Sequence, residues 1–63
     1  MNYGEKLLEF RAMHNLTQTE LAQILDVCVM TIVRLENGHN KPTKMGIIKY
    51  NNKMKEWEKI NNV

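Results

Sequence analysis

The segment from Thr17 to Gly38 constrains the fold more than any other part of the chain. Thr17 and Glu20 have the spacing of a capping box, in which each side chain bonds to the backbone amide of the other residue. Apolar residues then recur at the three- and four-residue spacing of one helix face, at Leu21, Ile24 and Leu25. The segment is therefore predicted to open with a short helix that begins directly after Thr17.

A second short helix is predicted after a tight turn. Asp26 ends the first helix, because aspartate tolerates a left-handed backbone better than most residues. The second helix runs from about Val29 to Asn37, with Ile32 and Leu35 facing inward. Gly38 is the glycine expected just past the end of a helix. Together the two elements form a helix-turn-helix over residues 17–37.

The residues of this segment resemble the Cro/repressor-type (XRE-like) helix-turn-helix family. The similarity covers residues 5–43, about two-thirds of the chain. Its motifs are Leu16-Thr17-Gln18-x-Glu20-Leu21-Ala22, Thr31-Ile32-x-Arg34-Leu35-Glu36-Asn37-Gly38 and Pro42. The chain departs from the family pattern at Asp26, where the family usually has glycine, and at Cys28, where it usually has serine or threonine.

The resemblance implies sequence-specific binding of double-stranded DNA by a phage- or bacterial-type transcriptional regulator, a repressor, with the second helix of the motif in the major groove. Arg34 is the candidate for a bidentate contact to guanine, while the apolar side chains of that helix are candidates for contacts to thymine methyl groups. The residues expected at DNA are Gln18, Cys28, Val29, Met30, Thr31, Val33, Arg34, Asn37, His39, Asn40 and Lys41.

Three residues have roles that the resemblance alone supplies. Gln18 is expected to brace both a phosphate and the second helix of the motif. Arg11 and Glu36 are expected to form a buried ion pair that ties the first helix of the chain to the end of the reading helix.

Two further interpretations stay open at this point, one of which is an alternative to DNA binding. Val29, Met30 and Val33 give the second helix an unusually apolar outer face, which suits an antitoxin-like or accessory protein-interaction module. The chain could also be a fragment of a longer repressor. Steep salt dependence of binding would favour DNA over a protein partner.

Length and composition exclude several classes. Sixty-three residues make one domain, residues 1–63, which buries only about 60% of its unfolded surface. One cysteine and two isolated histidines, His14 and His39, favour neither a disulfide framework nor a metal site. The sequence offers no signal peptide or membrane span and no evident cofactor, small-molecule ligand or catalytic constellation, so we expect a cytoplasmic protein that is not an enzyme.

Charge is distributed unevenly along the chain. Residues 1–33 carry two basic and four acidic side chains, whereas residues 34–55 carry six basic side chains and one acidic one. The basic block begins on the second helix of the motif and continues beyond it, which would attract phosphate. A lysine-rich solvated surface explains the same block equally well.

The flanking segments are also predicted to be helical. Residues 3–14 form a helix that Asn15 ends, with Gly4 before its start or at a frayed first turn. Residues 38–43 form a loop. Residues 43–60 form either one helix or two helices broken at Asn51-Asn52, and the resemblance favours the break. The expected fold is thus an all-α, four- to five-helix bundle, with five helices preferred.

One reading helix spans only a few base pairs, so useful affinity calls for a homodimer on a pseudo-palindromic site with half-sites about 34–36 Å apart. The stretch Tyr50–Ile60 is the candidate dimer surface. Its aromatic residues, Tyr50 and Trp57, belong either to this surface or to the core.

Overall fold

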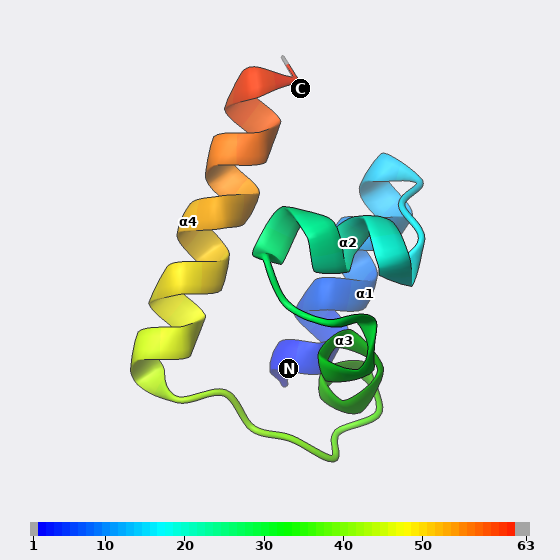
Figure 1. Ribbon diagram of the computed structural model, residues 1–63, viewed down its shortest axis with the longest axis vertical. Helices are drawn as coiled ribbons and strands as arrows, with labels where there is room; N and C mark the ends of the chain where they lie inside the picture. The colour runs from blue at the N-terminus through cyan, green and yellow to red at the C-terminus, as the bar shows by residue number, and fades with distance from the viewer. Residues whose placement is uncertain (1, 62–63) are drawn as a thin grey trace.

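The computed structural model describes residues 2–61 and contains, within them, four α-helices and no strand. The helices are α1 (Tyr3–His14), α2 (Gln18–Leu25), α3 (Val29–Glu36) and α4 (Lys44–Ile60). Figure 1 shows α2 above α3, α1 behind them, and α4 standing to one side. The all-helical architecture and the two helices of the motif are confirmed.

The helix starts follow from local capping chemistry. The Glu20 amide donates to the Thr17 hydroxyl at 3.1 Å, and the Thr17 amide donates to the Glu20 carboxylate at 2.9 Å, so the predicted capping box is present. Thr43 caps α4 in a similar way, with its hydroxyl accepting from the Gly46 amide at 3.0 Å. These contacts satisfy amides that have no partner inside the helix.

The first three helices end in the same way. Each is followed by a residue with a left-handed backbone: Asn15 (φ 54°), Asp26 (φ 58°) and Gly38 (φ 77°). In each case the next residue's amide donates to a carbonyl five residues back, to Arg11, Ala22 and Arg34 at 2.9, 3.0 and 2.9 Å. This is the backbone hydrogen bond of a Schellman motif. It gives a donor to a helix-end carbonyl that has no partner inside the helix, and the chain turns sharply there. The predicted helix ends are therefore confirmed.

The core lies where the four helices meet. The buried apolar side chains are Leu7, Phe10, Leu21, Ala22, Leu25, Ile32, Leu35 and Met54. Helix α3 packs against both α1 and α2, while α4 packs mainly against α2. The helix-turn-helix is therefore supported from two sides.

The prediction of a break at Asn51-Asn52, and with it the preference for five helices, is wrong. Helix α4 runs without interruption through both asparagines. Asparagine in a helix interior costs about 0.7 kcal/mol relative to alanine. The Asn51 side chain accepts a hydrogen bond from the Tyr3 hydroxyl at 3.1 Å, and Tyr50, Met54 and Trp57 pack against the core on either side of it. These tertiary contacts offset the poor local preference.

The sequence suggested that Gly4 precedes α1 or lies in a frayed first turn, and this prediction is wrong. Gly4 is buried inside α1, and a Cβ atom at this position would collide with the carbonyl oxygen of Leu35. The missing side chain thus allows the backbone of α1 to approach the end of α3 directly.

None of the helices described in residues 2–61 has both the length and the apolarity that crossing a membrane would need.

Candidate nucleic-acid interface

Helix α3 turns one face to the core and leaves the other free. Ile32 and Leu35 are buried, as predicted, and hold the helix against α1 and α2. On the opposite face Val29 and Met30 are 41% and 50% exposed. Arg34 is exposed as well, whereas Thr31 and Val33 are half-buried at the edges. The structure therefore gathers the predicted reading residues on one accessible side of a supported helix.

Cys28 marks the start of α3 and is exposed. Within the described chain its thiol caps no backbone amide of α3, since cysteine is not among the side chains that cap helix starts well. The sulfur lies 3.2 Å from the Thr31 hydroxyl. Hydrogen bonding with the Thr31 side chain is the largest effect on the pKa of this thiol and lowers it.

The loop after α3 forms a hollow beside that helix. Asn37, His39, Asn40 and Lys41 are all exposed. Three of them join Thr31 and the start of α4 around an open cavity of about 410 Å³, lined by Thr31, Leu35, His39, Asn40, Lys41, Pro42, Thr43, Gly46 and Tyr50. The loop residues predicted at DNA are therefore brought next to α3 and not scattered over the surface.

Gln18, Arg11 and Glu36 meet at the end of α3. The Gln18 side-chain amide donates to Glu36 Oε1 at 3.0 Å, and Arg11 Nη1 donates to the same oxygen at 3.5 Å. Arg11 Nε lies 3.4 Å from Glu36 Oε2, an ion-pair contact without hydrogen-bond geometry. The Glu36 side chain is 4% exposed and that of Arg11 is 21% exposed.

This cluster joins three helices at one carboxylate. Arg11 belongs to α1, Gln18 is the first residue of α2, and Glu36 is the last residue of α3. A carboxylamide nitrogen carries two protons, and Glu36 uses one of those on Gln18. The Gln18 side chain is thus oriented by α3 while it keeps a second donor.

Only the first part of the basic block lies at this interface. Arg34, Lys41 and Lys44 are exposed on α3, the loop and the first turn of α4. Lys49, Lys53 and Lys55 follow between one and about three turns further along α4. Positive charge beside α3 therefore comes from fewer side chains than the linear count indicated.

One contact was not anticipated from the sequence, and the structure decides one alternative that the sequence left open. His14, taken as isolated, lies with Nε2 2.9 Å from Glu58 Oε2 and packs edge-on against the rings of Phe10 and Trp57. Tyr50 and Trp57 pack against the core, so the predicted dimer stretch turns its aromatic side chains inward. The exposed large apolar residues of α4 are Met45, Ile48 and Ile60. The helical spacing of Tyr50, Met54 and Trp57 was the available signal for the inward stripe.

Comparisons with known proteins agree with this geometry. The helix-turn-helix family model matches residues 7–53. An uncharacterized HTH-type transcriptional regulator of Methanocaldococcus jannaschii is 47% identical over 38 residues, which are 60% of this chain and 58% of that protein. The chain thus matches little more than half the length of this curated relative. No solved structure gave a significant match. The family match and the arrangement of α2 and α3 show that the chain belongs to the helix-turn-helix family, of the Cro/repressor (XRE) type.

Proposed function

We propose that the protein is a transcriptional regulator that binds double-stranded DNA through α3. The observation that carries this proposal is the exposed face of α3, held by a buried face and by the Gln18–Glu36–Arg11 cluster. The similarity to an HTH-type transcriptional regulator supports it. A short helix fixed in this way and accessible on one side is the element that enters the major groove.

Base reading is assigned to the outer face of α3. Arg34 is its one exposed side chain with a fork of donors that fits O6 and N7 of a guanine. Val29, Met30 and Val33 offer no hydrogen bond and fit the C5-methyl groups of thymines. We therefore expect a half-site that combines at least one guanine with neighbouring A·T pairs.

Phosphate contacts are assigned to the residues around α3. Gln18 keeps a free amide proton at the start of α2, where the helix dipole also favours an anion. The remaining candidates are Cys28, Thr31, Asn37, His39, Asn40 and Lys41. Such contacts fix the position of the protein on the duplex and carry no sequence information.

The proposal includes a homodimer that binds a pseudo-palindromic operator. The protein would act there as a repressor, and its location would be the cytoplasm. Of the stretch Tyr50–Ile60, Ile60 is the large apolar side chain that stays exposed. Ile60→Glu should weaken self-association in analytical ultracentrifugation without unfolding the chain. Trp57→Glu does not serve this purpose, because Trp57 packs against Phe10 and a charge there would disturb the core.

Salt dependence tests the function against its main alternative. The apolar Val29–Met30 surface also suits an accessory or antitoxin-like protein partner. With DNA, the logarithm of affinity should fall steeply with the logarithm of salt concentration, and Lys41→Ala should reduce the slope by about one unit. Lys59→Ala, at the far end of α4, is the matched control and should leave the slope unchanged. Absence of duplex binding at low salt would overturn the proposal in favour of the protein-interaction module.

A further inference from the structure

Helix α4 carries a row of exposed side chains along one side of its whole length. We call this row the α4 stripe; it consists of Met45, Lys49, Asn52, Glu56 and Ile60, and all five residues are exposed. Their spacings of four, three, four and four residues keep them within a sector of about 80° around the helix axis. Figure 1 shows the other three helices together on one side of α4. Much of the α4 surface is therefore left without a partner in the described chain.

The two ends of the stripe are apolar. Met45 and Ile60 are each 76% exposed, more than any other large apolar side chain in residues 2–61. They lie fifteen residues apart, which is about 22 Å along a helix. Isolated apolar residues are common on protein surfaces, so the surroundings of each residue decide its meaning.

Ile60 borders a small hollow between α4 and α2. The hollow has a volume of about 230 Å³ and is lined by Ile24, Lys53, Glu56, Trp57 and Ile60. Ile24 belongs to α2, and the other four residues belong to α4. The volume is smaller than the range of about 300–1,000 Å³ that is typical of small-molecule sites. The hollow therefore suits one inserted apolar side chain, and the flexible side chain of methionine fills irregular gaps of this kind well.

The middle of the stripe carries one charge of each sign. Lys49 and Glu56 are both exposed, and within residues 2–61 neither side chain belongs to an ion pair. They are seven residues apart, whereas ion pairs along a helix join residues three or four positions apart. Each charge is therefore available to an opposite charge on another molecule.

The stripe is complementary to a second copy of itself when two α4 helices lie antiparallel. A two-fold axis between Asn52 and Lys53 places positions at equal distances on either side of the axis opposite one another, as in any contact between identical surfaces. Met45 of each copy then faces Ile60 and the hollow of the other copy. At the centre, the Lys53 ammonium group of one copy faces the Asn52 side chain of the other, whose oxygen can accept from it.

Charge decides the direction of this pair. In the antiparallel arrangement Lys49 of each copy faces Glu56 of the other, so the attraction occurs twice by symmetry. A parallel arrangement would place Lys49 against Lys49 and Glu56 against Glu56, and both contacts would be repulsive. The apolar ends, the central polar contact and the charges therefore favour one direction and one register.

We propose that the partner of α4 is a second copy of this chain, bound antiparallel through the α4 stripe and the hollow beside Ile60. The inference rests on the homodimer of the proposed function and names the contacts that hold it. The aromatic residues Tyr50 and Trp57 do not form this contact surface, because they pack against the core. One helix face buries less than the roughly 1,200 Å² of a stable interface, so the pair is weak and forms at high protein concentration.

Sedimentation velocity on the whole chain, without DNA and at low salt, tests this pairing. Lys49→Glu alone and Glu56→Lys alone should each weaken self-association about tenfold, because each substitution turns two attractive contacts into repulsive ones. An equimolar mixture of the two variants should restore the association, because every cation then faces an anion in the mixed pair. Lys55→Glu is the matched control, since it makes the same change of charge outside the stripe, beside α1, and should have little effect.

Each outcome of this experiment decides the inference. All three residues are exposed, so the variants should keep the helical circular dichroism of the unmodified chain. A mixture that associates no better than either variant, or equal effects of Lys55→Glu and Lys49→Glu, would overturn the pairing. An unmodified chain that stays monomeric at millimolar concentration would also overturn it and leave the stripe to another partner. Because no DNA is present, none of these results bears on duplex binding by α3, which the salt-dependence experiment measures separately.

Discussion

Single residues fix how α3 sits on the rest of the protein. Gly4 lets the backbone of α1 touch the last turn of α3, and Glu36 holds Arg11 and Gln18 at the same end. Both contacts join residues more than fifteen positions apart. A helix of eight residues such as α3 is too short to be stable alone, so its orientation depends on such contacts.

Gly4→Ala should destabilise the protein, although alanine is the better helix former by about 1 kcal/mol. The new methyl group would meet the Leu35 carbonyl oxygen and force α1 away from α3, at a cost of about 1–3 kcal/mol. Urea denaturation followed by circular dichroism measures the change. Gly46→Ala is the matched control, because its Cβ meets Thr43 Oγ1 at 3.4 Å and should be neutral or slightly stabilising.

Glu36→Ala should lower the free energy of unfolding by about 2–3 kcal/mol, because it leaves Arg11 half-buried without its counter-charge and Gln18 without its acceptor. A double-mutant cycle with Arg11→Met should give a coupling energy of about 1–3 kcal/mol. If the two substitutions changed the free energy of unfolding additively, the ion pair between Arg11 and Glu36 would contribute no interaction energy to stability.

The elements themselves differ in how far they follow from local sequence. The capping box at Thr17 and the left-handed residues Asn15, Asp26 and Gly38 act within a few positions, and the sequence predicted all of them. The continuity of α4 does not follow locally, because it depends on Tyr3 reaching Asn51 from 48 residues away. Local sequence therefore predicted three helix ends correctly and left the continuity of α4 open, and the break that the family resemblance favoured is absent.

Asn52→Ala tests the continuity of α4. Asn52 is exposed within the helix, so alanine should raise the free energy of unfolding by about 0.5 kcal/mol through helix propensity alone. Asn51→Ala is the contrasting variant and should gain less or lose stability, because it removes the acceptor of the Tyr3 hydroxyl. No gain, or a loss, for Asn52→Ala in chemical denaturation would contradict an uninterrupted helix.

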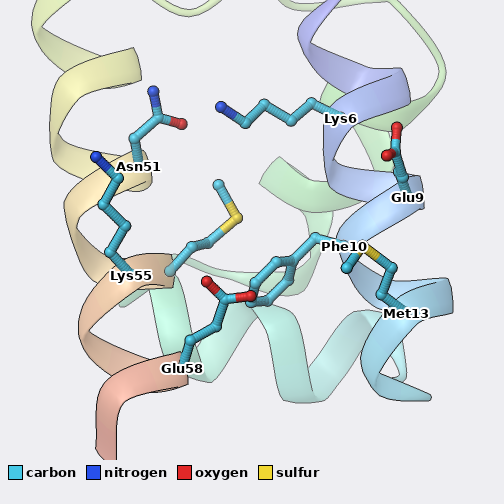
Figure 2. A pocket seen from close by; sticks show the side chains of 8 residues that line it. Lys6, Glu9, Phe10, Met13, Asn51, Lys55 and Glu58 are labelled. Carbon is cyan, nitrogen blue, oxygen red and sulfur yellow. The ribbon is translucent and has the colours of Figure 1, made fainter. Parts of the chain in front are cut away.

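At the scale of the whole molecule, a few side chains hold α4 against α1 and α2. Helix α4 packs mainly on α2 and reaches α1 through Tyr3–Asn51, His14–Glu58 and the edge-on rings of Phe10 and Trp57. A groove of about 540 Å³ between α1 and α4 lies between these attachments (Figure 2).

Tyr3 makes this attachment sensitive to alkaline pH. Burial, with Tyr50 adding a smaller effect, raises the pKa of Tyr3 from 10.0 to about 12. The folded state holds the phenolic proton of Tyr3 more tightly than the unfolded state does. The contribution of this proton to the free energy of unfolding is therefore complete below pH 10.0 and is lost as the pH rises toward 12. Tyr3→Phe should flatten the decline of unfolding free energy across that interval, whereas Tyr50→Phe should leave most of it.

Much of the candidate interface was predictable, for an identifiable reason. The outward residues of α3 follow from helix geometry once Ile32 and Leu35 face inward. The Gln18–Glu36–Arg11 cluster was anticipated only by family resemblance, because its members are far apart in the chain. The α1–α4 groove was not anticipated, since it depends on the separation of two helices that the sequence does not specify.

Selection from a randomised duplex pool at moderate salt tests the central claim, that α3 reads DNA sequence. We predict enrichment of an inverted repeat with a guanine in each half-site, and loss of the preference for that guanine with Arg34→Ala. Lys59→Ala, at the far end of α4, should enrich the same repeat as the unmodified chain. A pool that stays random, or one that is identical for the unmodified chain and Arg34→Ala, would contradict the claim.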